Sequence, residues 1–319
     1  MRVLRRSQPL LFAFLFLSCS HPPKPSFSTD DNPALPAALV VEREISGMIL
    51  GKPLRYPFGL AVDAGGRVYV SDAGNSRVIK FDPNLKPERE IGGYGAQEGL
   101  FDRPSYLTVD RELSLLVSDE GNRRICRYDS YLQFVEALPF YDSEDPLKFG
   151  YPSGIALTEY GEVWAADRER NRIVVYDNVG TFDRFVGDFG YPGGQVANPE
   201  KIIKDIRGNF IVCDGGNRRL VVYDEYGNFS SEITDESLQY PVAAVSENHH
   251  LWILDSASGK VYHFDSRGKK DFEAGPRLAG TLIDLKEPSD IVLLSSGRLI
   301  ISDSGNNRLL VCRVIYEGE

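Results

Sequence analysis

Histidine and cysteine are scarce in this sequence, which contains only four of each among its 319 residues. The histidines, at positions 21, 249, 250 and 263, do not recur at the spacing of a metal site. The motifs H-E-x-x-H, C-x-x-C, G-x-S-x-G and G-x-x-x-x-G-K-[ST] are also missing. Their absence argues against a zinc protease, a thiol oxidoreductase, an α/β-hydrolase and a P-loop nucleotidase.

Positive charge is also in short supply, because 36 Lys and Arg face 46 Asp and Glu, for a net charge of −10. Three of the arginines precede residue 7, so the remainder of the chain carries 33 − 46 = −13. Nucleic-acid affinity depends on basic contacts to phosphate, so we expect no nucleic-acid partner. An anionic membrane surface would repel the chain for the same reason.

The apolar run at residues 9–17 is too short to span a bilayer. It follows three arginines and precedes small residues that end at Cys19, which predicts a signal peptide over residues 1–19. Phe16-Leu17-Ser18 before Cys19 resembles a bacterial lipobox, in which the cysteine carries the lipid. Ordinary secretion is the alternative. We therefore expect a protein of the bacterial cell envelope, periplasmic or cell-surface, attached to a membrane through its lipid only.

Residues 20–38 are rich in Pro, Ser and Asp, which predicts an extended tether. After it, no long stretch has the periodicity of an amphipathic helix, and a segment recurs six times instead. A proline opens each copy 42 to 48 residues after the last: Pro57, Pro104, Pro152, Pro199, Pro241 and Pro288. An aspartate recurs with the same steps to within one residue: Asp72, Asp119, Asp167, Asp214, Asp255 and Asp303. Because the prolines and the aspartates recur independently with nearly the same spacing, the sequence contains an internal repeat.

Each copy contains short segments rich in β-branched and aromatic residues, such as RVYVSD, separated by Gly, Asp and Asn turns. This pattern predicts an all-β, six-bladed β-propeller with four-stranded blades over residues 39–319, and we expect a monomer. The ring must close, because open sheet edges tend to pair with other chains. VEREISG, from Val41, echoes PEREIGG, from Pro87. We therefore expect residues 40–46 to supply the outer strand of the last blade.

These residues resemble the NHL repeat family, whose blades carry a P-x-G-I-A-V-D strand, a second strand ending in Asp, and N-x-R-I before the third strand. Copies one, two, four and six match this pattern well. Copy three has Arg170 in place of Asn, and copy five has Ser258 and Lys260 in place of Asn and Arg. The resemblance implies the propeller fold but no single function, because NHL propellers include lyases, sensors and binding modules.

Residues present in every copy solve a packing problem common to all blades, so we interpret them as structural. Asp72, Asn75, Arg77 and their equivalents are expected to hold the turn between the second and third strands and to bridge neighbouring blades. The cysteines of copies two, four and six (Cys126, Cys213 and Cys312) lie on alternate blades. We expect them to be buried thiols and not disulfides.

Residues that differ between copies are the candidates for function. We call the face that carries the second-to-third-strand turns and the connections into each proline the top face. The residue before each proline forms a ring there: Tyr56, Arg103, Tyr151, Asn198, Tyr240 and Glu287. The second residue after each proline is small except at Tyr106, Lys201 and Asp290. Together with Glu200, these residues form the predicted binding site.

Two functions fit this pattern. The first is a binding or scaffold module that holds a protein or a carbohydrate on the top face and needs no cofactor. The second is a metal-dependent hydrolase, lactonase or lyase, because related six-bladed enzymes use mainly carboxylate and amide ligands. Glu200, Glu287 and Asp290 would then contribute ligands, with calcium as one candidate metal. A zinc lyase with channel histidines is disfavoured, because the four histidines do not come from several blades at one level.

Overall fold

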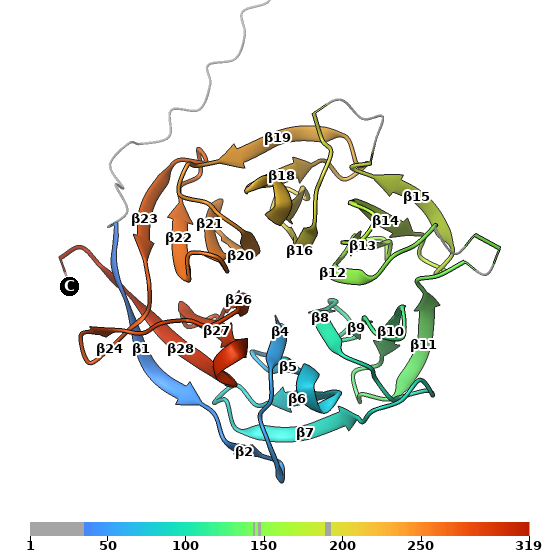
Figure 1. Ribbon diagram of the computed structural model, residues 1–319, viewed down its shortest axis with the longest axis horizontal. Helices are drawn as coiled ribbons and strands as arrows, with labels where there is room; N and C mark the ends of the chain where they lie inside the picture. The colour runs from blue at the N-terminus through green and yellow to red at the C-terminus, as the bar shows by residue number, and fades with distance from the viewer. Residues whose placement is uncertain (1–34, 143, 146–147, 189–192, 319) are drawn as a thin grey trace, which may run out of the picture. The chain divides into compact units, whose positions relative to one another are not determined.

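The short β-branched and aromatic segments form six antiparallel sheets that surround a common centre as the blades of a propeller, as predicted (Figure 1). The computed structural model describes residues 35–142, 144–145, 148–188 and 193–318. The predicted signal peptide and residues 20–34 of the predicted tether lie outside this part. Within it, no helix is both long enough and apolar enough to cross a membrane.

Each blade begins at its proline with a strand next to the centre and continues outward (Figure 1). Blade 1 contains β4 (Pro57–Val62), β5 (Val68–Asp72), β6 (Arg77–Phe81) and β7 (Pro87–Gly92). Blade 2 contains β8 (Pro104–Val109), β9 (Leu115–Asp119), β10 (Arg124–Tyr128) and β11 (Phe134–Pro139). Blade 3 contains β12 (Pro152–Leu157), β13 (Val163–Asp167), β14 (Arg172–Tyr176) and β15 (Phe182–Val186).

The remaining blades follow the same order. Blade 4 contains β16 (Pro199–Lys204), β17 (Phe210–Asp214), β18 (Arg219–Tyr223) and β19 (Phe229–Thr234). Blade 5 contains β20 (Pro241–Glu247), β21 (His250–Asp255), β22 (Lys260–Phe264) and β23 (Lys270–Ala274). Blade 6 contains β26 (Pro288–Leu293), β27 (Arg298–Asp303), β28 (Arg308–Tyr316) and β1 (Pro36–Ile45).

The N-terminal strand β1 closes the ring, as predicted from the VEREISG echo. It pairs antiparallel with β28, with Val40 opposite Arg313 and Glu44 opposite Leu310. It begins at Pro36, four residues before the start that the sequence suggested. Glu44 and its equivalent in blade 1, Glu90, each pair with the repeat arginine of their own blade. The two segments therefore share a sequence because each supplies the glutamate of the same ion pair in its blade.

Two of the connections between blades contain a short β-hairpin. β2 (Met48–Ile49) and β3 (Lys52–Pro53) lie between the closing strand and blade 1. β24 (Arg277–Leu278) and β25 (Thr281–Leu282) lie between blades 5 and 6, where β24 adds a parallel pairing to β1. The outer edge of β1 is thus partly covered, which protects it from pairing with another chain.

The hydrophobic core is divided into layers between neighbouring blades. One layer joins blades 3 and 4, where the rings of Trp164 and Phe210 stack with their centroids 4.0 Å apart. Another joins blades 5 and 6 through Trp252 and also contains Leu39 and Val41 of the closing strand. The thiols of Cys126, Cys213 and Cys312 are free and buried in such layers, as predicted.

The repeated aspartates hold the turns between the second and third strands, as predicted. Asp72 accepts hydrogen bonds from the Asn75 amide at 2.8 Å, the Arg77 guanidinium at 2.7 Å and the Arg55 backbone N–H at 2.8 Å. Blades 2, 4 and 6 repeat this arrangement. In three blades the turn folds as a short 3-10 helix: η1 (Ala73–Asn75), η2 (Gly215–Asn217) and η3 (Ser304–Asn306).

The bridging role predicted for the arginines is more local than expected. Arg77 donates to the carbonyl of Ile49 and pairs with Glu90 of its own blade. In blade 2, Arg124 donates to the carbonyls of Ala96 and Leu100. Each arginine therefore ties its turn to the connection that enters its own blade. Asp255, in the blade that lacks the motif, accepts three backbone N–H groups instead.

Candidate functional site

The top face carries the two loop types that the sequence placed together. Because the Asp72 carboxylate joins its own turn to the Arg55 N–H, the turn and the connection into Pro57 lie side by side. The opposite face, here called the lower face, carries the turns between the first and second strands and those between the third and fourth strands of each blade.

The residues before the prolines form a ring that is accessible to solvent. Four of them are exposed (Tyr56, Arg103, Asn198 and Glu287), and Tyr151 and Tyr240 are half-buried. The Tyr56 hydroxyl donates to Glu287 at 3.0 Å, which pairs blades 1 and 6 at the rim. The Arg123 guanidinium lies 4.4 Å from the ring centroid of Tyr151. Arg103 and Asn198 stand apart from these pairs.

The same four exposed residues have left-handed backbones, with φ between 46° and 54°. The side-chain oxygen of Asn307 accepts a hydrogen bond from the backbone N–H of Tyr56 at 2.8 Å, and that of Asn171 accepts one from Asn198 at 2.8 Å. Each asparagine belongs to the preceding blade. A left-handed non-glycine residue is strained and marks function when it is isolated. Here it recurs in four blades, so we attribute it to the construction of the fold.

One polar cluster fills the centre of the ring below these residues. Glu200 is 3% exposed and accepts the Tyr240 hydroxyl at 2.8 Å. The Tyr106 hydroxyl, also buried, lies 3.3 Å from Glu200 and 3.1 Å from the carbonyl of Val242 across the channel. Arg168 approaches Glu200 to 3.6 Å and pairs with Glu120 at 2.8 Å. The cluster therefore joins blades 2, 3, 4 and 5.

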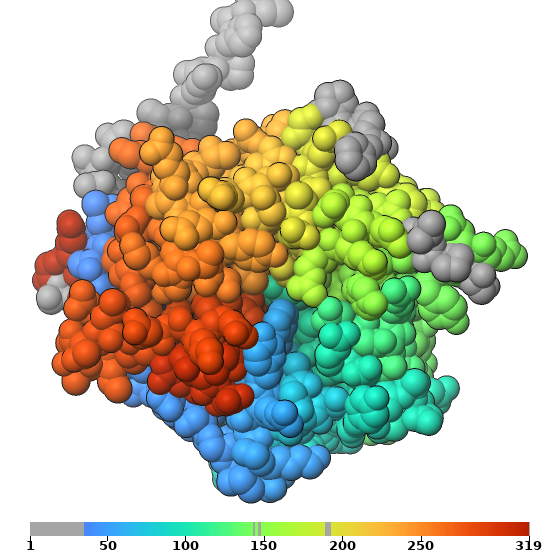
Figure 2. Space-filling view, in the orientation of Figure 1, coloured from blue at the N-terminus to red at the C-terminus, as the bar shows by residue number. Residues whose placement is uncertain are grey.

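A buried ion pair completes this layer. The Lys201 ammonium lies 2.5 Å from Asp290 and 3.0 Å from the carbonyl of Ile291, which links blade 4 to blade 6. Asp290 also accepts the backbone N–H of Leu60 at 2.7 Å. Seen from one face, the atoms of the blades meet at the centre and no hole passes through (Figure 2).

The structure thus brings together five of the ten predicted site residues as one channel layer (Tyr106, Glu200, Lys201, Tyr240 and Asp290). Sequence reasoning missed Arg168 and Glu120, which join this layer. The signal was present, since the four other blades have Ala73, Gly215, Ser256 and Ser304 at this place in the turn. Two large charged residues among small ones depart from the repeat in the way that identified Lys201.

Burial sets the electrostatics of this layer. Desolvation raises the pKa of Glu200, and the nearby Arg168 guanidinium opposes that rise. Desolvation likewise raises the pKa of Asp290, opposed by Lys201. The pKa of the Tyr106 hydroxyl is raised by burial and by the adjacent Glu200. Both carboxylates are therefore held by cations and donors of the protein itself.

The three carboxylates considered as metal ligands do not converge. Glu287 pairs with Tyr56 at the rim, Glu200 belongs to the Arg168 cluster, and Asp290 pairs with Lys201. Among the described residues, no group of three His, Cys, Asp or Glu side chains is placed to hold a metal ion. The carboxylate oxygens instead accept hydrogen bonds from protein donors, which compete with a cation such as Ca²⁺ for the same lone pairs.

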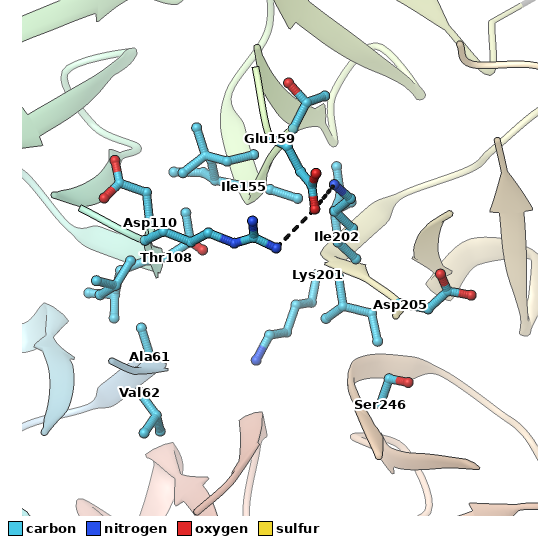
Figure 3. A pocket seen from close by; sticks show the side chains of 18 of the residues that line it. Ala61, Val62, Thr108, Asp110, Ile155, Glu159, Lys201, Ile202, Asp205 and Ser246 are labelled. Carbon is cyan, nitrogen blue, oxygen red and sulfur yellow. Dashed lines mark hydrogen bonds and ion pairs between the residues drawn. The ribbon is translucent and has the colours of Figure 1, made fainter. Parts of the chain in front are cut away.

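A large cavity, here called the channel-mouth cavity, opens on the lower face, on the other side of the channel layer. It measures about 810 Å³ and is lined by the later parts of the inner strands (Figure 3). Figure 3 shows Ala61, Val62 and Ile155 on its wall, and the Lys201 side chain reaches into it. Charged residues such as Asp110, Glu159 and Asp205 stand at its rim. Of the ten predicted residues, Lys201 alone lines it.

A sequence model of the NHL repeat family matches residues 54–81, 149–176 and 285–312. These segments cover the first three strands of blades 1 and 3 and, in blade 6, β26, β27 and the first part of β28. This chain is an NHL-repeat β-propeller. Blade 3 of the NHL propeller matches the family although Arg170 replaces the usual asparagine. The Arg170 backbone N–H donates a hydrogen bond to Asp167 at 3.1 Å, whereas blade 1 uses the side-chain amide of Asn75 for the equivalent aspartate.

Known proteins resemble this NHL propeller at low identity. Protein brain tumor of Drosophila melanogaster is 25% identical over 124 residues, which are 38% of this chain and 12% of that protein. A gluconolactonase from Xanthomonas campestris matches with a TM-score of 0.64 and 14% identity, over 89% of this chain and 98% of its own. Virginiamycin B lyase from Staphylococcus aureus gives 0.60 and 14%, over 87% and 100%. At such identities the similarity to the solved structures extends to the fold alone.

Proposed function

We propose that this NHL-repeat propeller is an exported, lipid-anchored binding module that holds a protein partner on its top face. The observation that carries the proposal is the filled channel layer, in which Tyr106, Glu200, Lys201 and Asp290 bond to other parts of the protein. A general base or a metal ligand must present an open lone pair to its substrate or ion. Binding at the surface makes no such demand, and so it fits this layer better than the hydrolase, lactonase or lyase alternative.

The composition of the top ring favours a protein over a carbohydrate on this face. Tyrosine and arginine are enriched at protein interfaces, and the ring places Tyr56, Arg103 and Tyr151 around one rim. Three cavities in the described part of the chain, of about 810, 650 and 400 Å³, are lined by residues outside this ring. Small ligands prefer enclosed sites, whereas a broad face with exposed side chains suits a protein partner.

A photo-crosslinking amino acid at Arg103 or Asn198 is expected to trap one discrete partner protein on intact cells. Both side chains are exposed and free of the rim pairs, so the replacements should leave the fold intact. The matched control is the same replacement at Arg267, an exposed turn residue on the lower face. Adducts of equal yield from Arg267, or none from either top-face position, would argue against a top-face protein partner.

Lipid attachment at Cys19 is the second part of the proposal and is supported by the lipobox-like FLSC sequence. Full-length protein is expected to incorporate radiolabelled palmitate and to partition into the detergent phase of Triton X-114. Cys19→Ser should abolish both, because a thioether-linked lipid needs the thiol. Cys312→Ala, which removes a buried thiol, should abolish neither. Labelling that survives in Cys19→Ser would disprove the anchor and leave top-face binding as a separate question.

A further inference from the structure

The tips of the lower-face turns can be compared because five blades build them alike. In each turn between the third and fourth strands, an aspartate accepts the backbone N–H of the residue two positions later. These tip residues are Asn84, Tyr131, Val179, Tyr226 and Arg267 in blades 1 to 5. Because only the backbone N–H is used, the fold does not dictate the tip side chain. Blades 1 and 5 have polar tips, whereas blades 2, 3 and 4 expose Tyr131 (76%), Val179 (74%) and Tyr226 (71%).

The turns between the first and second strands repeat this asymmetry. Blade 3 exposes Tyr160 (79%) and blade 4 exposes Ile206 (67%). Blade 1 has Ala64 and Gly65 in the same turn, and blade 2 has Arg111 and Glu112. Exposed aromatic and aliphatic side chains that gather on one part of a surface mark an interaction site. Blades 1 and 2 serve as internal controls, since the same turn forms there without these side chains.

Tyr160, Ile206 and Tyr226 line one groove of about 650 Å³ between the lower faces of blades 3 and 4. We call it the lower groove. It shares Tyr160, Ile206 and Lys204 with the channel-mouth cavity, so the two spaces are adjacent. A volume of this size lies within the range of about 300–1,000 Å³ that is typical of ligand sites.

The polar groups of the lower groove identify the class of ligand. It contains four carboxylates and three cations, and several of these pair with each other. Arg184 contacts Glu162 at 3.2 Å and Lys204 contacts Glu159 at 3.9 Å. A strongly charged ligand would have to compete with these pairs. A neutral polyhydroxylated ligand would not, because its hydroxyls can use the lone pairs that the ion pairs leave open.

The two tyrosines fit the apolar component of such a ligand. The rings of Tyr160 and Tyr226 are both highly exposed and line the same groove. The faces of a pyranose ring present C–H groups, which pack on aromatic rings, while the hydroxyls point outward toward polar partners. The residues that line this groove come mainly from turns, and only Arg184 and Lys204 among them lie in strands, so the groove is poorly suited to adding a peptide as a further strand.

We propose that the lower groove binds a neutral oligosaccharide whose rings stack on Tyr160 and Tyr226. This site is separate from the protein partner assigned to the top face. Because the lower groove is adjacent to the channel-mouth cavity, we expect a longer chain to extend toward Lys201. The two faces could then hold a protein and a glycan at the same time, because the channel layer separates them.

Saturation-transfer difference NMR on the full chain in detergent tests the proposal, with neutral hexasaccharides of glucose, N-acetylglucosamine, mannose, xylose and galactose as probes. At least one hexasaccharide is expected to bind. Tyr226→Ala and Tyr160→Ala should each weaken it roughly tenfold, through loss of one stacking contact. Tyr160→Phe should keep most of the affinity, since the ring remains. Tyr131→Ala is the matched control, because Tyr131 occupies the same turn position and does not line the groove.

Three results would overturn the proposal: no binding of any of the five probes, equal loss of affinity in Tyr131→Ala, or equal loss in Arg103→Ala. The last would place the sugar on the top face. Saccharide binding that persists in Arg103→Ala supports the lower groove, whether or not the separate crosslinking experiment traps a protein at residue 103. The outcome is therefore independent of the fate of the top-face protein partner.

Discussion

A chain that starts at Gly47, and so lacks β1, is expected to lose the monomeric, cooperatively folded propeller. Without β1 the edge of β28 is bare and the core layers on both sides of blade 6 are opened. Leu39, Val41 and Ile45 are each buried, and each contributes about 1.5–3 kcal/mol by its burial. Their sum is comparable to the total stability of about 5–15 kcal/mol that is typical of a domain. The lost backbone hydrogen bonds add to this cost.

Light scattering coupled to size exclusion, with thermal melting followed by circular dichroism, measures this effect. The chain starting at Gly47 should elute as oligomers or aggregates, because the bare strand pairs with other chains. The matched control starts at Leu35 and keeps the whole of β1, and it should be monomeric with a sharp transition. A monomer with the same melting temperature in both chains would show that β1 is dispensable for closure.

Asp290→Ala is expected to cost about 3–5 kcal/mol of unfolding free energy, the usual result of removing one partner of a buried ion pair. The substitution leaves the Lys201 ammonium buried with only the carbonyl of Ile291 as a partner. It also leaves the backbone N–H of Leu60 without its acceptor. Urea unfolding of the variant and the wild type at one pH gives the difference directly.

Lys204→Met is the control for the ion pair, because Lys204 lies on the same strand and makes only a long, partly exposed contact of 3.9 Å with Glu159. Its loss should cost less than about 1 kcal/mol. If Asp290→Ala also cost less than about 1 kcal/mol, the Lys201 ammonium would have found water or another acceptor, and the channel layer would not be closed.

The pH dependence of Lys201→Met follows from the same layer. Burial raises the pKa of Asp290, and Lys201 is the main group that opposes this rise. Without Lys201 the folded pKa rises further above the unfolded one. Below the unfolded pKa the Asp290 carboxyl is protonated in both states, so it costs no folding free energy. As pH rises from there through the folded pKa, the unfolded state loses its proton first, and the free energy of unfolding falls. The stability gap between variant and wild type should therefore widen from acid to neutral pH.

Much of the fold followed from local and periodic features of the sequence. Pro57 and Asp72 recur in every copy because each blade must begin its inner strand and hold its turn in the same way. The echo between residues 41–47 and 87–93 located the closing strand, since Glu44 and Glu90 make the same contact with an arginine. Such features are visible in the sequence because the same contact recurs from blade to blade and therefore repeats the same residue types.

The sequence by itself determined the number of blades, the closing strand and the level of the channel at which Tyr106, Lys201 and Asp290 lie. Only the tertiary structure decided which of these residues meet, that Arg168 joins them, and that the large cavities open on the lower face. The contacts of Lys201 with Asp290 and of Tyr106 with Glu200 join residues 89 and 94 positions apart. Contacts of this kind depend on how side chains from different blades fill one channel. The spacing of a repeat carries no information about which of those side chains touch.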